Sequence, residues 1–401
     1  MKKQPTNPYY HPEETQGRRR TSTAGSPYAQ DDRRGQYGAA SPRKNKKKKG
    51  GHRFLTTLLV LLLLCGGGYY ALNYLVTGGA PSLPSLMNTP QEIRDDVVNI
   101  LCAGIDYEEG RDYTDGMGMT DVVMYVSFDV KANRINMLQI PRDTYVGEEV
   151  PTGGTGKINA VARSGKEDPA IANLAAVLND QLKLPVDYYV TIDMDAFKTV
   201  INAIGGIEVT VPFNITDDYG NTLKAGTQIV DGDTAEFMVR QRHNYANADI
   251  GRLEMQRYMY SALLKTFKSF PAKDVIKVLP AYIQYVKTDI GVAKMGGLAL
   301  AVREVPSENI TMFTLPCEPC NWNGKSLVSV HKEAAAEMLN SYFRPYSDPV
   351  PADQLTIIEL ANSGRDSGTV QSMDKIDSGT ANWGKDSYTQ PETPASSSQA
   401  K

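Results

Sequence analysis

The chain has 401 residues, 41% of them hydrophobic, which is enough to bury one large core or two ordinary ones without disulfide or metal staples. Its net charge of −3 hides an asymmetry. Residues 1–50 contain 13 Lys and Arg against 4 Asp and Glu, whereas the remainder contains 30 basic and 42 acidic residues. We therefore expect the two parts to lie in different surroundings.

An uncharged stretch of 23 residues, 54–76, separates the two parts. As a helix it would be about 34 Å long at ~1.5 Å per residue, enough to cross a bilayer. The Lys and Arg cluster just before it predicts a cytoplasmic N-terminus and an extracellular chain after about Thr77. A buried core helix and a cleaved signal peptide are the alternatives, but the stretch is apolar all round and exceeds the usual signal core of roughly 7 to 15 residues. The expectation is a single-pass protein of the cell membrane.

Composition sets the other boundaries. Residues 1–53 lack apolar periodicity and are predicted to be a disordered, basic cytoplasmic tail, which beside a membrane helix is expected to contact anionic lipid and no nucleic acid. Residues 77–94 are predicted to be a linker and 95–345 a folded extracellular domain. Residues 363–401, rich in Ser, Thr, Gly and Asp, are predicted to be a disordered tail.

The hydrophobic patterns of the folded region predict both strands and helices. A nearly continuous apolar run at 97–106 is typical of a strand buried on both faces, and 122–130 and 135–140 indicate a hairpin; further strands are expected at 188–192, 207–211 and 310–315. Helices are expected at 168–181, 196–204, 234–238, 252–270, 272–285, 292–304 and 331–343. This order predicts an α/β fold with a mixed central β-sheet flanked by helices on both faces, preceded by one transmembrane helix.

The four cysteines give little sign of chemistry. Cys65 lies in the predicted membrane stretch and Cys102 in an apolar strand, so neither is expected to be catalytic. Cys317 and Cys320 form a C-x-x-C without two further zinc ligands nearby. They are either a local clip or two free thiols.

Two aspartates stand where strands are predicted to end or begin. Asp106 ends the first strand and Asp121 opens the second, so the loop between them brings both carboxylates toward one neighbourhood. Paired carboxylates facing a phosphate commonly hold a hard cation such as Mg²⁺. Turn-forming or capping aspartates are the alternative, and these two residues alone do not decide between them.

Arginines occur at three further places. Pro141 breaks the third strand, so that Arg142 can point off its end, although a surface ion pair with Asp143 is the alternative. Arg240 and Arg242 share one face if their segment is extended. Because two adjacent guanidiniums repel each other unless an anion lies between them, an oligoanion ligand is predicted.

The long helix predicted at 252–270 adds polar residues. Arg252 and Gln256 lie four apart and share a helix face. Asp249 is an N-cap, a residue that orients an arginine, or a general base. Lys157, in the segment GKINA, supplies one more cation, and His243 is interpreted as structural.

Several of these segments occur together in one known order. They are NILCAGID, DVVMYVSF, MLQIPRDTYV, GKINAVARSG, DYYVTIDMDAFKTVINAIGGIEVTVP, DGDTAEFMVRQRH and DIGRLEMQR, within about residues 95–270. With them the chain resembles the LytR-CpsA-Psr (LCP) family of cell-wall glycopolymer ligases. Most members carry arginine where this chain has Met119 and Met255, so its site holds fewer cations than usual.

The resemblance implies an Mg²⁺- or Mn²⁺-dependent phosphotransferase that moves a glycopolymer, such as teichoic acid or capsule, from undecaprenyl diphosphate to peptidoglycan and releases undecaprenyl phosphate. It implies a metal at Asp106 and Asp121, a lipid tail in an apolar cleft between sheet and helices, and a diphosphate bound by Arg142, Lys157, Arg240, Arg242, Arg252 and Gln256. Arg142 would be catalytic, with Asp143 and Asp249 as candidate general bases. A hydrolase acting on the same lipid and a non-catalytic regulator or polymer-binding membrane protein are the competing functions.

Overall fold

The computed structural model describes residues 83, 87–106, 118–165, 170–216, 220–241, 249–271, 286–363 and 368–377. The predicted cytoplasmic tail, the apolar stretch 54–76 and the helix predicted at 272–285 lie outside these residues. None of the helices within the described ranges combines the length and hydropathy that a membrane span requires.

A seven-stranded mixed sheet forms the centre of the fold, in the order β13-β10-β3-β2-β1-β4-β9. Its strands are β1 (Val97–Asp106), β2 (Met119–Asp129), β3 (Arg134–Ile140), β4 (Tyr188–Asp193), β9 (Val286–Thr288), β10 (Ile310–Thr314) and β13 (Thr369–Ser372). The β1–β4 and β3–β10 pairs are parallel, and the other four neighbouring pairs are antiparallel. The predicted mixed sheet, including the β2–β3 hairpin, is confirmed.

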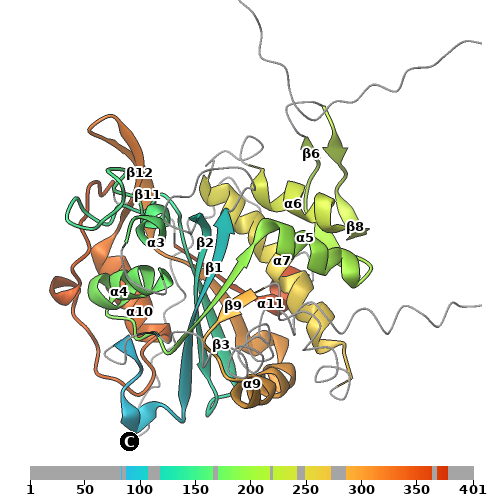
Figure 1. Ribbon diagram of the computed structural model, residues 1–401, viewed down its shortest axis with the longest axis horizontal. Coiled ribbons are helices and arrows are strands. Elements are labelled where there is room, and N and C mark those ends of the chain that lie inside the picture. Colours follow the sequence, from blue (N-terminus) through green and yellow to red (C-terminus); the bar gives the residue numbers. More distant parts are fainter. Residues whose placement is uncertain are drawn as a thin grey trace, which may run out of the picture. The chain divides into compact units, whose positions relative to one another are not determined.

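Helices cover both faces of this sheet (Figure 1). One face carries α3 (Val161–Ser164), α4 (Ile171–Leu182) and α10 (Lys332–Tyr342). The other carries α5 (Met194–Ala203), α6 (Gly232–Arg240), α7 (Asp249–Lys268), α9 (Val292–Glu304) and α11 (Met373–Asp377). Because side chains alternate along a strand, Ile100 of β1 packs on the face covered by α7, whereas Leu101 packs on the face covered by α4. This is why the sequence of β1 is apolar at nearly every position.

Smaller elements complete the described chain. Three two-stranded ribbons pair β5 (Ile207–Val211) with β8 (Gly226–Val230), β6 (Ile215–Thr216) with β7 (Thr222–Leu223), and β11 (Cys317–Trp322) with β12 (Lys325–Val330). Short 3-10 turns lie at η4 (Gln91–Ile93), η5 (Ile158–Ala160), η7 (Ser307–Asn309) and η8 (Ala352–Gln354). Cys317 and Cys320 therefore lie on a strand, and no disulfide joins them, so the local clip is wrong.

The prediction of a disordered tail is wrong at residues 369–377, which form β13 and α11. This polar segment is held by Arg257 of α7, whose side chain is fully buried. Its guanidinium donates to Gln371 Oε1 at 2.9 Å and to the hydroxyl of Thr369, both on β13, as well as to Gln139 Oε1 at 2.8 Å. The partner that orders the tail is more than a hundred residues away, so composition does not reveal it.

Candidate functional site

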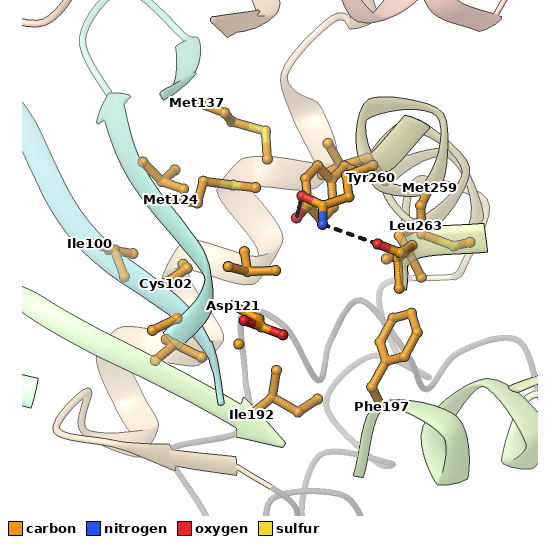
Figure 2. Close-up of a pocket in the computed structure, with 18 of the residues that line it drawn as sticks. Ile100, Cys102, Asp121, Met124, Met137, Ile192, Phe197, Met259, Tyr260 and Leu263 are labelled. Carbon is orange, nitrogen blue, oxygen red and sulfur yellow. Dashed lines mark hydrogen bonds between the residues drawn. The ribbon is translucent and has the colours of Figure 1, made fainter. Parts of the chain in front are cut away.

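An apolar groove lies between the helices α7 and α9 and the face of the central sheet that they cover (Figure 2). Its empty volume is about 1360 Å³, part of which opens to solvent. The walls come from β1, β2, β3, β4, α5, α6, α7 and α9, and include Ile100, Cys102, Met124, Met137, Ile192, Phe197, Met259, Leu263 and Leu298. From Asp121 to Phe128 the groove follows seven residues of β2, roughly 24 Å at ~3.4 Å per residue. The groove is long, and nearly all of its lining is apolar.

Polar side chains appear at one end of this groove, where Asp106, Asp121, Asp193 and Gln256 enter its lining. Asp106 is the last residue of β1, and its carboxylate is 25% exposed. Figure 2 shows the carboxylate of Asp121 directed into the same space. We call this end the mouth of the groove.

Asp121 reaches the mouth through a β-bulge. Gly104 of β1 pairs with Val122, but the next residue, Ile105, pairs with Thr120, so Asp121 has no partner on β1. Strict alternation would place Asp121 with Val123, on the opposite face of the sheet. The extra residue re-aims the side chain, as bulges beside functional sites commonly do.

Gly118 makes the close approach of the two strand ends possible. A Cβ at this position would lie 2.1 Å from the backbone oxygen of Asp106, a distance that no side chain can adopt without moving the strand. Only glycine therefore leaves Asp106 where it is. Sequence reasoning missed this residue, because its constraint depends on the pairing of β1 with β2.

Arg142 and Lys157 approach the mouth from two loops that are tied together. The backbone N–H of Asn159 donates to Arg142 O at 3.1 Å, which fixes the loop after β3 against the segment that carries Lys157. Arg142 Nη1 lies 2.5 Å from Asp121 Oδ1, whereas its Nε is 4.0 Å from Asp143 Oδ1. Lys157 Nζ lies 3.0 Å from Asp143 Oδ1. The predicted Arg142–Asp143 contact is therefore longer than the contact between Arg142 and Asp121.

Arg240 reaches the mouth from the end of α6. Its Nη2 lies 3.0 Å from Asp106 Oδ1 and its Nη1 2.9 Å from Glu236 Oε1, one helical turn earlier. The prediction of an extended segment is wrong at Arg240, which is the last helical residue, and Arg242 lies outside the described residues. Glu236 was not predicted, although its i,i+4 spacing from Arg240 is a usable signal.

The helix α7 places two nearly fully buried polar residues behind the mouth. Arg252 is 2% exposed and donates from Nη2 to Asp121 O at 3.3 Å. Gln256 is 1% exposed, accepts from the Tyr260 hydroxyl at 3.3 Å, and contacts Val239 O at 3.5 Å (dashed lines in Figure 2). Asp249 begins α7, and its side chain lies outside the described residues.

Met119 and Met255 stand where most members of the resembled family carry arginine, and their surroundings differ. Met255 is fully buried in the apolar core beside α7, so no cation stands there. Met119 opens β2, and its sulfur lies 3.8 Å from Asn159 Nδ2. Cys102 is also part of the groove wall, where burial raises the pKa of its thiol to about 12 and keeps it protonated at neutral pH.

Two carboxylates, those of Asp106 and Asp121, are the candidate Mg²⁺ ligands at the mouth. Within the described ranges no three acidic, histidine or cysteine side chains cluster as a metal site. Magnesium commonly needs only one or two carboxylates, since substrate phosphates and water fill its other positions. Asp106 and Asp121 line one space and meet that requirement, although each is now paired with an arginine.

Fold and site together define an α/β protein whose groove is apolar along its length and charged at its mouth. The chain belongs to the LytR_cpsA_psr family, whose model matches residues 82–344. It is 32% identical over 198 residues to the polyisoprenyl-teichoic acid–peptidoglycan teichoic acid transferase TagU of Bacillus cereus (strain AH820), covering 49% of this chain and 62% of that protein. It is also 32% identical over 228 residues to the transferase TagV, of the same description, from Bacillus subtilis (strain 168), covering 54% and 55%.

The matched part of the chain thus spans less than two thirds of these curated relatives. Among solved structures, protein gbs0355 from Streptococcus agalactiae is similar with a TM-score of 0.55 and 24% identity, over 68% of this chain and 96% of that one. At this identity the similarity concerns the fold alone.

Proposed function

We propose that this protein transfers a phosphate-linked glycopolymer of the teichoic acid or capsule type from undecaprenyl diphosphate to peptidoglycan and releases undecaprenyl phosphate. One observation carries the proposal: cationic side chains surround the mouth of a groove that is otherwise hydrocarbon. The names of the relatives support a polyprenyl-linked teichoic acid donor and a peptidoglycan acceptor.

The groove matches the two chemical halves of such a donor. Burial of apolar surface stabilises a prenyl tail by about 0.8 kcal/mol per CH₂ group before ordering costs. A groove roughly 24 Å long therefore has ample surface to hold the lipid against water. At its mouth, Arg142 and Arg240 contact the carboxylates of Asp121 and Asp106, beside which a diphosphate would bind when the tail lies in the groove, and Arg252 lies behind them.

In the proposed reaction, a peptidoglycan sugar hydroxyl attacks the phosphorus that carries the glycopolymer. A new P–O bond forms while the bond from that phosphorus to the bridging oxygen of the diphosphate breaks. The lipid leaves as undecaprenyl phosphate, and the hydroxyl proton passes to a base. No covalent bond to the protein is needed.

The protein contributes fixed positive charge to this reaction. Asp121 holds Arg142, and Asp106 and Glu236 hold Arg240, so both guanidiniums already lie at the mouth before they turn to the phosphates of the substrate. Oriented charges meet the negative charge that develops on the phosphoryl oxygens, and they act more strongly in a partly closed site than in water. Asp143, 3.0 Å from Lys157, and Asp249 remain the candidate general bases.

Asp106 and Asp121 would hold Mg²⁺ together with the diphosphate oxygens. The ion would neutralise phosphate charge and favour departure of undecaprenyl phosphate. Binding of the ion requires that Arg142 and Arg240 shift from these carboxylates to the phosphates. The proposal also includes a membrane anchor at 54–76 and an extracellular catalytic domain, which would place the mouth beside lipid donor and cell wall.

The test uses the full-length protein in lipid nanodiscs with an undecaprenyl-diphosphate-linked glycan, Mg²⁺ and peptidoglycan fragments, with products identified by mass spectrometry. Glycan phosphate joined to peptidoglycan, and lost in Arg142→Ala and Asp121→Ala, supports transfer. Arg134→Ala, at the exposed opposite end of β3, is the matched control and should retain activity. Free glycan phosphate alone would indicate a hydrolase, and binding without turnover would indicate a non-catalytic protein.

A further inference from the structure

A second pocket lies near the start of β1, on the face of the sheet opposite the groove. It has an empty volume of about 700 Å³, part of it open to solvent, and lies between the segment 88–99, the loop after α4 and the loop after α10. Asn99 in its lining precedes Asp106 by seven residues of β1, roughly 23 Å at ~3.3 Å per residue. We propose that this pocket binds a hydroxyl-bearing anion, such as a polyol phosphate or an acidic sugar.

The floor of the pocket is rigid, and its hydrogen bonds fix the orientation of Asn99. Asp187 accepts from the backbone N–H groups of Thr89 and Asn99, both at 2.8 Å, and from the Thr89 hydroxyl at 2.6 Å. Since the Thr89 hydrogen goes to a carboxylate, Thr89 Oγ1 can only accept from Asn99, whose Nδ2 lies 2.8 Å away. The amide oxygen of Asn99 must therefore point away from Thr89.

That amide oxygen is an acceptor without a donor. Asn99 is 2% exposed, and its buried Oδ1 has no hydrogen-bond partner in the described part of the chain. The same is true of the buried Oδ1 of Asn88, which lines the same pocket. A buried acceptor left unsatisfied costs about 1–3 kcal/mol, so two such acceptors on residues that line one pocket favour a ligand that supplies hydroxyl or N–H donors.

Arg344 adds a positive charge to the wall. It is 7% exposed; its Nη1 donates to Asn340 Oδ1 at 3.0 Å and its Nη2 to Leu182 O, while its buried Nε has no partner within the described ranges. Both of these acceptors are neutral. Burial lowers the pKa of Arg344 to about 10, which still leaves the guanidinium charged at neutral pH.

Together these groups select a ligand class. Two carbonyl acceptors require donors such as hydroxyl groups, and a buried guanidinium that lacks a carboxylate partner is best compensated by an anion. Phe343, Pro185 and Pro345 provide apolar wall suited to the C–H surface of a sugar or polyol. The lining carries Lys183 and Arg344 against the single carboxylate of Asp348, and ordered water would satisfy the acceptors without balancing this excess of positive charge. A glycopolymer repeat and an acidic peptidoglycan sugar share the required chemistry.

The inference is independent of the transfer reaction, because binding here is measured without turnover. Glycerol 3-phosphate, N-acetylmuramic acid and inorganic phosphate are titrated calorimetrically into full-length protein carrying Arg142→Ala, which weakens phosphate binding at the groove mouth. Asn88→Leu removes one unsatisfied acceptor at a residue with no internal side-chain hydrogen bond among the described residues. Asn321→Leu, on the exposed β11 strand, is the matched control.

We expect at least one hydroxyl-bearing probe to bind, with about tenfold weaker binding in Asn88→Leu and unchanged binding in Asn321→Leu. Preference for glycerol 3-phosphate would identify the glycopolymer as the source, and preference for N-acetylmuramic acid would identify peptidoglycan. The inference is overturned if neither probe binds, if inorganic phosphate binds equally well, if Asn88→Leu has no effect, or if soaked crystals show only water between Asn88, Asn99 and Arg344.

Discussion

Filling the groove at Cys102 tests whether it holds a lipid tail. This residue lies four positions before Asp106 on β1, roughly 13 Å from the mouth at ~3.3 Å per residue. Its side chain is small and projects from the groove wall (Figure 2). Cys102→Trp therefore places an indole in the open groove, where it blocks any tail that runs past this point.

The size of the effect follows from the surface that the tail would lose. Five carbons of one prenyl unit correspond to roughly 4 kcal/mol at ~0.8 kcal/mol per buried group. The groove contains flexible Met124, Met137 and Met259, whose adjustment should recover about half of that loss. The remaining ~2 kcal/mol predicts a fall of roughly 30-fold in kcat/KM for a long-chain donor.

The assay compares undecaprenyl and geranyl diphosphate donors carrying the same glycan. The geranyl chain is too short to pass Cys102, so its kcat/KM should change less than about threefold. Cys320→Trp, on β11 and outside the groove, is the matched control. Equal losses for both donors, or undiminished use of the undecaprenyl donor, would refute a lipid tail in this groove.

Three further changes probe the site and its frame. Gly118→Ala should lower kcat/KM at least tenfold with the fold retained, because the new Cβ, 2.1 Å from Asp106 O, must displace the strand end. Arg257→Met should lower the free energy of unfolding in urea by roughly 3 kcal/mol, since Gln139 and Gln371 lose their buried donor. Asp289 should contribute a loss of stability as pH rises from 4 to 7, because burial raises its pKa from 3.8 to about 6 and the unfolded chain ionises first. This contribution is roughly 3 kcal/mol at most and complete above pH ~6, and the difference between the parent protein and Asp289→Asn should show it.

Each of these has a clear contrary result. Full activity in Gly118→Ala would mean that the position of Asp106 does not matter to the reaction. An unchanged unfolding midpoint in Arg257→Met would mean that β13 and α11 are held by other contacts. An identical pH profile of unfolding in Asp289→Asn would assign the pH dependence to other carboxylates.

Elements with strong local signals were predictable from the sequence. The strand 97–106, the strand 207–211 and the helix 292–304 match β1, β5 and α9 residue for residue. Continuous apolar runs, helical spacing and stops at Gly or Pro act between near neighbours in the chain, so one sequence is enough to read them. The strands β11 and β13 were missed because their sequences lack such a local pattern.

The grouping of Asp106 with Asp121 was predictable from the sequence, but the contacts of the candidate site residues were not. Asp106 and Arg142 were singled out because Asp106 ends a predicted strand and Arg142 follows one, where α/β sheets present functional groups. The sequence gives no sign that Arg142 pairs with Asp121, or that Arg240 ends a helix and pairs with Asp106. These pairings join elements that are up to 134 residues apart.

By itself the sequence determined the periodicity of this protein's elements, its family resemblance and the residue types of its site. Only the tertiary structure decided that a bulge turns Asp121 toward the groove, that Arg257 orders the polar segment 369–377, and that Asn99 and Arg344 meet in one pocket. The physical reason is that periodicity arises from neighbouring residues. Strand register, buried polar partners and pocket walls arise from contacts between distant segments, whose energies exist only after the sheet has paired.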